Sequence, residues 1–256
     1  PLILPLRNPS RAPRLPDCEP RPFSYGDFEL AREALQGVDA LFMVSAAESP
    51  TREQEHLTLV RAAQAAGIQH LVYLSFAEAR PDSTFTLART HAITEEAIRR
   101  STMKHTFVRD NFYSELMARL ADAEGVICGP AEQGRVACVA QRDAAQAVAN
   151  IMADIAAGGT QHQGRTYTLT GSQSLSMEDI ARILTTCTGK PHRFHNETIA
   201  EAFASRRAAY PDTPDWEIEA WVSTYTAIAK GELAQVTQDL PRLIGREPLT
   251  FEQVVT

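Results

Sequence analysis

The stretch ALFMVSAAESPTREQEHLTLVRAAQAAGIQHLVYLS, residues 40–75, decides the fold. It opens with the continuous apolar run Ala40–Val44 and closes with a second apolar run, Leu71–Leu74. Between them, apolar residues recur at helical spacing over residues 52–66, and Gly67 ends the pattern. Strands that are apolar on both faces and separated by a helix indicate a parallel sheet covered by helices on both sides. The stretch therefore predicts an α/β domain.

The same alternation continues in both directions along the chain. Further strands are expected at residues 2–6, 106–108 and 166–170, and further helices at 27–35, 87–100, 142–157, 176–186, 194–210 and 216–228. Right-handed crossovers then give a Rossmann-like doubly wound parallel sheet. We assign residues 1–157 to this nucleotide-binding domain. Residues 158–256 are assigned to a smaller α/β substrate lobe, to which the loop-like segment 125–135 contributes.

The chain lacks the glycine fingerprint that follows the first strand of a dinucleotide-binding unit. Its opening strand, Leu2–Leu6, ends at Arg7 and matches the second strand of such a unit. The first strand is central in the strand order 3-2-1-4-5-6, so a sheet without it leaves ladder groups unpaired. We therefore expect a strand, a Gly-rich loop and a helix, roughly 30 residues in all, upstream of Pro1.

Charge and composition exclude several function classes. The formal net charge of −7 does not provide the basic surface that nucleic acids require. No apolar run is long enough to span a membrane, and no signal peptide precedes the first strand. The four cysteines, Cys18, Cys128, Cys138 and Cys187, lack the paired spacing of a metal site or a disulfide framework. These features predict a cytoplasmic protein with reduced thiols and no metal site.

Polar residues follow the expected strands, where ligands bind in open α/β sheets. Arg7 and Arg11 follow the first strand, and no acidic residue stands there to hold a free ribose 2′-hydroxyl. A planar guanidinium suits a phosphate, so these arginines favour NADP(H) as cofactor over NAD(H). The alternative is that both are solvated surface residues.

Several motifs, taken in order, resemble those of the NmrA-like family of atypical short-chain dehydrogenases/reductases. They lie at residues 6–11, 25–27, 34–40, 65–68, 73–75, 108–115, 164–171 and 243–250. Each motif is short, but their order is specific and spans nearly the whole chain. The resemblance is nearest to the branch of NADPH quinone oxidoreductases and triphenylmethane-dye reductases.

This resemblance implies an NAD(P)H-dependent reductase that transfers hydride to a quinone, a dye or a similar aromatic acceptor. His91 is similar to a histidine of that branch, which implies that it holds the substrate or donates a proton to the reduced acceptor. The alternative is a structural histidine on a polar helix face. The helix at 87–100 lacks the Tyr-x-x-x-Lys pair of ordinary short-chain dehydrogenases. Alcohol oxidation and sugar-nucleotide epimerisation are therefore disfavoured.

The other residues expected at the cofactor are Ser45, Ala46, Ala47, Ser75, Asn111, Phe112 and Tyr113. The small residues 45–47 allow the backbone to approach the cofactor closely. Ser75 either bonds the nicotinamide side or the substrate, or caps a turn. The resemblance implies that residues 111–113 line the nicotinamide pocket, although aromatic residues usually belong to the core.

A second function stays open at this stage: a non-enzymatic NADP(H)-binding redox sensor or regulator, because a fold does not decide between the two. His91 favours the enzyme. The expected partners are a small aromatic substrate and, for assembly, a second copy of the chain. Trp216, Trp221 and Tyr225 either pack the smaller lobe or line a flat aromatic pocket.

Overall fold

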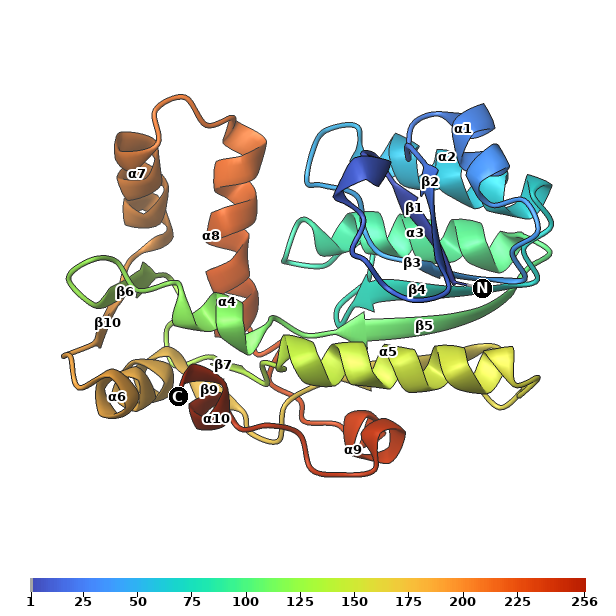
Figure 1. Ribbon diagram of the computed structural model, residues 1–256. Helices are drawn as coiled ribbons and strands as arrows, with labels where there is room; N and C mark the ends of the chain where they lie inside the picture. Colours follow the sequence, from blue (N-terminus) through green and yellow to red (C-terminus); the bar gives the residue numbers. More distant parts are fainter. Residues whose placement is uncertain (1) are drawn as a thin grey trace. The chain divides into compact units, whose positions relative to one another are not determined.

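The computed structural model describes residues 2–256 and shows an α/β protein with short parallel sheets (Figure 1). The chain forms two compact units. Unit 1 comprises Pro1–Ser75, Thr90–Phe107 and Met152–Thr166, and unit 2 comprises Phe76–Arg89, Val108–Ile151 and Tyr167–Thr256. The α/β class predicted from the sequence is confirmed. The division into residues 1–157 and 158–256 stays a prediction.

The largest sheet has the strand order β3-β4-β5-β8. Its strands are β3 (Ala40–Met43), β4 (His70–Phe76), β5 (Lys104–Asp110) and β8 (Arg165–Leu169). β3 and β4 pair in parallel, with Ala40 opposite His70. Since consecutive parallel strands need a crossover, α2 (Arg52–Ala65) connects them. The strand–helix–strand pattern predicted for residues 40–75 is confirmed.

The core of unit 1 lies between the strands β3, β4 and β5 and three helices. The helices are α1 (Phe28–Ala34), α2 and α3 (Ala88–Arg100). Leu71 and Tyr73 on β4 are fully buried in one apolar cluster with Leu59 of α2 and Ile98 of α3. This packing holds α2 and α3 against the sheet. It also fixes the positions of the buried polar side chains near the start of each helix, Arg52 and His56 on α2 and His91 on α3.

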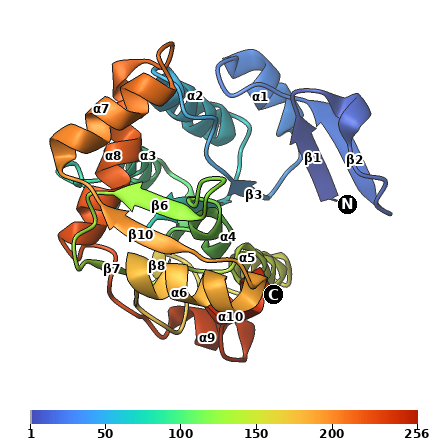
Figure 2. The same ribbon diagram turned by 90° about the vertical axis from the view of Figure 1, so that its left-hand side faces the viewer.

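A separate two-stranded sheet pairs β1 (Leu2–Leu6) with β2 (Cys18–Pro22) in parallel, with Leu2 opposite Cys18 (Figure 2). Sequence reasoning missed β2, because Pro20 and Pro22 lack N–H groups and argue against a strand. Both prolines are tolerated because β2 pairs only on its β1 side. Within residues 2–256 no ladder joins this pair to β3. The strand expected between them stays a prediction.

Most of the remaining elements lie in unit 2. They are α4 (Ser114–Ala118), β6 (Val126–Gly129), β7 (Arg135–Val136), α5 (Gln141–Ala156), β9 (Leu175–Ser176), α6 (Met177–Thr188), β10 (Arg193–Asn196), α7 (Ile199–Ala209), α8 (Asp215–Ala229), α9 (Asp239–Ile244) and α10 (Phe251–Val255). One of them, α5, ends in unit 1, which takes up the chain at Met152. The capping box predicted at Ser176 is confirmed: its hydroxyl accepts from the Asp179 amide, and the Asp179 carboxylate accepts from the Ser176 amide.

Two expectations for this half of the chain are wrong. The segment 125–134, expected as a loop, contains β6, and the segment expected to be helical from residue 194 begins with β10. The two strands pair in parallel, with Phe194 opposite Ile127. Each is four residues long, too short to show a period, and the strand conformation is set by a partner 67 positions away in sequence. Local pattern therefore carried no signal for either strand.

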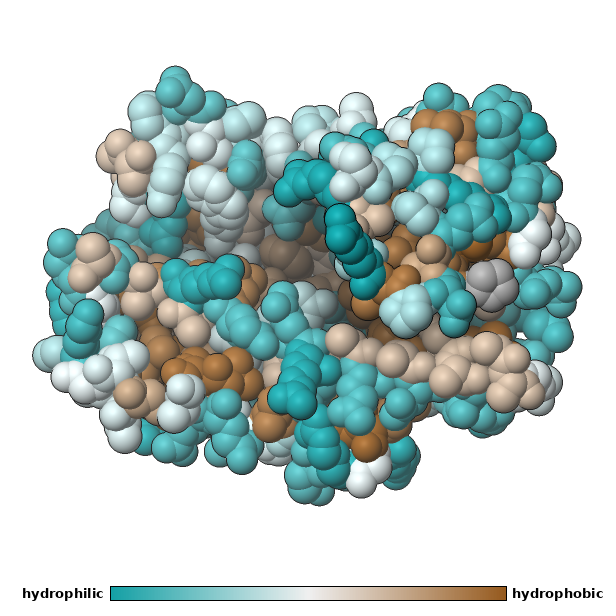
Figure 3. Space-filling view, viewed as in Figure 1, coloured by the Kyte–Doolittle hydropathy of each residue, from teal (hydrophilic) through white to brown (hydrophobic). Residues whose placement is uncertain are grey.

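Hydrophilic side chains cover much of the face seen in Figure 3. Of the helices between residues 2 and 256, none combines the length and the apolar character needed to cross a membrane.

Candidate cofactor and acceptor site

The loop that follows β3 is held by a buried histidine of α2. The Ala46 N–H donates to His56 Nε2 at 2.9 Å. His56 Nε2 is therefore the acceptor, and Nδ1 carries the hydrogen that is donated to Thr94 Oγ1 at 2.9 Å. Burial, with the nearby positive charge of Arg52, lowers the pKa of His56 to about 3. His56 is thus a neutral ring of one tautomer, and it anchors the segment that contains the predicted residues Ser45, Ala46 and Ala47.

His91 lies inside unit 1 between a tyrosine and an arginine. Its Nδ1 is 3.0 Å from the Tyr73 hydroxyl, and its Nε2 is 2.9 Å from an Arg52 terminal nitrogen. A guanidinium only donates, so Nε2 accepts and the Nδ1–H is donated to the Tyr73 oxygen. Burial raises the pKa of Tyr73 to about 12, while hydrogen bonds with Ser45 and Thr94 act in the opposite direction. Two predicted site residues, Ser45 and His91, therefore meet at Tyr73.

Ser75 is fully buried at the end of β4 and faces α3. Its hydroxyl donates to Glu95 Oε1 at 2.6 Å, and the other carboxylate oxygen of Glu95 lies 2.7 Å from an Arg99 nitrogen. This bond ties the carboxyl end of β4 to the second turn of α3. The role predicted for Ser75 at the nicotinamide or the substrate stays a prediction.

Arg7 and Arg11 are exposed after β1, the second of them in the short 3-10 helix Pro9–Arg11. Neither forms an ion pair with another described residue. Arg7 also lies near Tyr25, whose hydroxyl donates to the Val44 carbonyl at the exit of β3. Burial raises the pKa of Tyr25 to about 12 against the opposing positive charges of Arg52 and Arg7. The positive charges of Arg52 and Arg7 therefore both act on a tyrosine that is hydrogen-bonded to the exit of β3.

Arg52, the first residue of α2, was not singled out from the sequence. It is 5% exposed, it forms no ion pair within residues 2–256, and its Nε has no hydrogen-bond partner. A buried guanidinium without a carboxylate is costly, so it is a strong donor for an incoming acceptor. His56 follows one turn later on the same helix face. Two polar residues four positions apart on an otherwise buried face are the signal that could have identified both.

The predicted segment Asn111–Tyr113 lies in unit 2. The Asn111 amide donates to the Leu233 carbonyl at 3.0 Å, and its side-chain oxygen accepts from the Phe112 N–H at 2.8 Å. The Phe112 ring packs against Phe76 and Phe85, each with centroids 5.0 Å from its own. Asn111 and Phe112 are therefore held by the core of unit 2, and their cofactor contacts stay predictions.

Tyr113 differs from its two neighbours because it is only partly buried. Its hydroxyl donates to the carboxylate of Asp110, the last residue of β5. Asp110 is 7% exposed, and burial raises the pKa of this carboxyl to about 7. Sequence reasoning missed Asp110, although its place at a strand end was visible.

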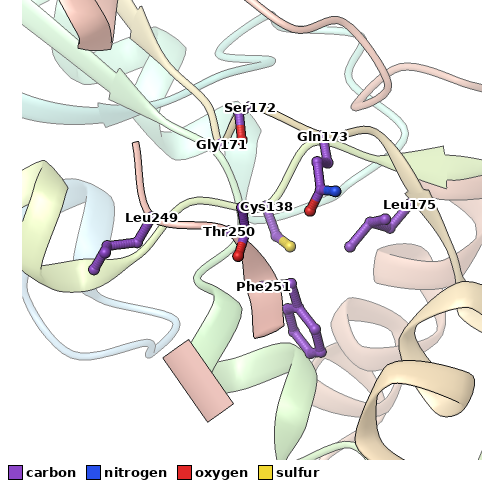
Figure 4. Close-up of a pocket in the computed structure, with 8 residues that line it drawn as sticks. All are labelled: Cys138, Gly171, Ser172, Gln173, Leu175, Leu249, Thr250 and Phe251. Atoms are coloured by element: carbon purple, nitrogen blue, oxygen red, sulfur yellow. The ribbon is translucent and has the colours of Figure 1, made fainter. Parts of the chain in front are cut away.

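A narrow crevice lies elsewhere in unit 2 (Figure 4). It is lined by Cys138, Gly171, Ser172, Gln173, Leu175, Leu249, Thr250 and Phe251. Burial raises the pKa of the Cys138 thiol to about 11, so the thiolate that a nucleophile needs does not form near neutral pH. None of the predicted site residues lines this crevice.

Two aromatic residues of α8, Trp221 and Tyr225, pack against neighbouring side chains. The Trp221 ring meets Tyr210 edge-on at 5.2 Å. Tyr225 is buried, and the guanidinium of Arg206 stands 5.6 Å from the centre of its ring. These contacts favour the packing alternative over an aromatic pocket for Trp221 and Tyr225.

Comparisons of the sequence and of the structure with known proteins agree with one another. The chain is 30% identical to quinone oxidoreductase 2 of Escherichia coli strain K12 over 256 residues, which is 98% of the chain and 87% of that protein. The crystal structure of an NADPH-dependent quinone oxidoreductase of Escherichia coli complexed with NADPH matches with a TM-score of 0.89 and 29% identity, over 99% of the chain and 88% of the other.

A second solved structure, Citrobacter sp. triphenylmethane reductase complexed with NADP(H), matches with a TM-score of 0.86 and 28% identity, over 99% of the chain and 89% of the other. The model of the NmrA-like family matches residues 24–252. The chain therefore belongs to the NmrA-like family, as its ordered motifs predict.

Proposed function

We propose that this chain is an NAD(P)H-dependent reductase that transfers hydride to a quinone, a dye or a similar aromatic acceptor. The observation that carries the proposal is the buried network after β3 and β4, in which His56 holds the Ala46 amide and His91 joins Tyr73 to Arg52. The relatives named as a quinone oxidoreductase and a triphenylmethane reductase support the same chemistry. α3 carries Arg89 and His91 in place of a tyrosine–lysine pair, so alcohol oxidation is not the proposed reaction.

The donors of unit 1 suit a dinucleotide phosphate. Arg7 and Arg11 are exposed without ion pairs, and Arg52 keeps an unpartnered buried N–H. In our proposal Arg7 and Arg11 hold the 2′-phosphate of NADP(H), with NAD(H) the weaker cofactor. The backbone of residues 45–47 and the side chain of Ser75 complete the proposed contacts of this unit. Cofactor contacts of Asn111, Phe112 and Tyr113 are proposed separately, on the resemblance alone. When bound, the reduced cofactor supplies the hydride.

The network also suggests what His91 does. Because its Nδ1–H is donated to Tyr73, the Tyr73 hydroxyl keeps its own proton for another acceptor. Because its Nε2 accepts from Arg52, the ring also orients that guanidinium. We therefore place His91 in the site as the group that positions Tyr73 and Arg52. The resemblance implies more, namely that His91 itself contacts the acceptor, and we keep this as a second part of the proposal.

The test is NADPH consumption by the protein with a panel of quinones, azo dyes and triphenylmethane dyes. We expect turnover with at least one acceptor and a preference for NADPH over NADH. Tight NADPH binding without turnover on any acceptor would favour the alternative, a non-enzymatic NADP(H)-binding sensor.

We further propose a cytoplasmic enzyme that acts on a small aromatic substrate and not on nucleic acid, in line with the net charge of −7. A homodimer is the proposed assembly. Cell fractionation and sedimentation velocity, respectively, test the compartment and the assembly.

A further inference from the structure

Asp110 and Tyr113 form a hydrogen-bonded pair where β5 ends. The Tyr113 hydroxyl donates to Asp110 Oδ2, and Asp110 makes no ion pair with the residues that the structure describes. Ligands of open parallel sheets bind outside the carboxyl ends of the strands. Asp110 is buried and Tyr113 is partly exposed. A ligand at this strand end would therefore meet the Tyr113 hydroxyl before the Asp110 carboxyl.

The backbone around the pair is fixed. Tyr113 is the N-cap of α4, and its carbonyl accepts from the Met117 N–H at 3.0 Å. It forms a parallel bridge with Val139, and the Ser114 N–H donates to the Val139 carbonyl at 2.9 Å. These bonds hold the Tyr113 Cα in place, so only the side-chain torsions are left to aim the hydroxyl.

The direction of the hydrogen bond depends on the protonation of Asp110. As a carboxylate, Asp110 accepts the Tyr113 proton, and the phenol has none to give elsewhere. As a carboxylic acid, Asp110 donates to the Tyr113 oxygen, and the phenol proton is free for a second acceptor. Burial raises the pKa of Asp110 to about 7, so both forms occur near neutral pH. Burial raises the pKa of Tyr113, and the charges of Asp110 and Glu115 raise it further, so the phenol itself stays protonated.

We propose that Tyr113 donates the proton that completes acceptor reduction and that Asp110 resupplies it. This inference rests on the proposed reductase function. A quinone gains two electrons with the hydride from NAD(P)H and still needs one proton. The Tyr113 O–H bond breaks as the new O–H bond of the hydroquinone forms. Tyr113 then takes the carboxyl proton of Asp110, and Asp110 takes one from solvent.

The chemistry of the acceptor separates this relay from simple binding. A quinone requires both hydride and proton, whereas a triarylmethyl cation becomes a neutral product on receiving hydride alone. The relay therefore predicts that its loss changes the ratio of the two rates. A purely structural or cofactor-binding role for the pair would lower both rates together.

The experiment compares Tyr113→Phe and Asp110→Asn with the unaltered protein and with Tyr210→Phe, an exposed tyrosine of the same unit. We measure kcat for a benzoquinone and for a triphenylmethane dye cation across neutral pH. The quinone-to-dye ratio should fall about 100-fold in both variants of the pair, the usual size of general acid catalysis, and stay unchanged in Tyr210→Phe. Quinone turnover of the unaltered protein should decrease as pH rises through about 7, where Asp110 loses its proton.

An unchanged ratio in both variants, with the unaltered protein active on both acceptors, overturns the relay and leaves the reductase function intact. If the unaltered protein reduces no acceptor, the proposed function fails and the relay with it. Thermal unfolding checks that the variants fold. Should Asp110→Asn not fold, Tyr113→Phe, which keeps the ring, decides the outcome through the same ratio.

Discussion

The main-chain N–H of Ala46 donates to Nε2 of His56 across 2.9 Å, which ties the loop after β3 to α2. Replacing the imidazole removes the acceptor for a main-chain group that has no alternative partner in the described structure. We expect His56→Phe to raise the KM for NADPH about tenfold, since loss of a partly buried hydrogen bond costs on the order of 1 kcal/mol. kcat should change less, because the loop is assigned to binding.

Steady-state kinetics with varied NADPH check this prediction. His105→Phe is the matched control, because His105 is a histidine of β5 whose ring stacks on Phe107. A fall in kcat with an unchanged KM in His56→Phe would mean that the loop does not bind the cofactor.

Stability should depend on pH through His56 and Asp110 with opposite signs. The pKa of His56 is lowered by burial from 6.5 to about 3, so the unfolded chain binds the proton first. The contribution of His56 is therefore complete above pH 6.5 and is lost as pH falls towards 3, with a slope of up to about 1.4 kcal/mol per pH unit. The pKa of Asp110 is raised by burial from 3.8 to about 7, so its contribution is complete below pH 3.8 and is lost as pH rises from 3.8 to about 7.

Urea unfolding at several pH values separates the two groups. His56→Gln should reduce the loss of unfolding free energy on acidification below pH 6.5, and Asp110→Asn should reduce the loss on moving from acid to neutral pH. Identical pH dependence in the unaltered protein and in both variants would show that neither group titrates as its surroundings indicate.

The pH prediction also shows where sequence reasoning stopped. Apolar runs and helical spacing were enough to predict β3, α2 and β4, because long elements on a buried sheet repeat their pattern locally. Position at strand ends was enough to select Ser45 and Ser75. The buried face of α2 offered a signal for His56, but nothing local identifies Asp110 as buried, because its burial comes from the packing of other elements against it. Short strands such as β10 depend on a distant partner in the same way.

Arg7 and Arg11 should decide the choice of cofactor. Each charge-assisted bond to a phosphate is worth about 1.5–3 kcal/mol, so Arg7→Ala and Arg11→Ala should each lower the preference for NADPH over NADH by at least about tenfold. The physical reason is that NADH lacks the 2′-phosphate, so its binding loses no contact when either arginine is replaced. The ratio of kcat/KM for the two cofactors is the measurement.

Arg14→Ala provides the control, since Arg14 is an exposed arginine in the same connection between β1 and β2. If kcat/KM for NADPH and NADH fell equally in Arg7→Ala and Arg11→Ala, the 2′-phosphate assignment would be wrong.

His91 and Tyr73 should act as a coupled pair. His91→Phe removes one hydrogen-bond partner from the buried Arg52 guanidinium and one from the buried Tyr73 hydroxyl, which should cost about 2–4 kcal/mol of unfolding free energy. Tyr73→Phe removes only one hydroxyl and should cost less.

A double-mutant cycle on kcat for the preferred acceptor should give a coupling energy of about 1–3 kcal/mol, because each ring acts through the other. Additive effects on kcat would mean that His91 reaches the acceptor without Tyr73, and a His91→Phe protein with unchanged turnover and cofactor binding would remove His91 from the site.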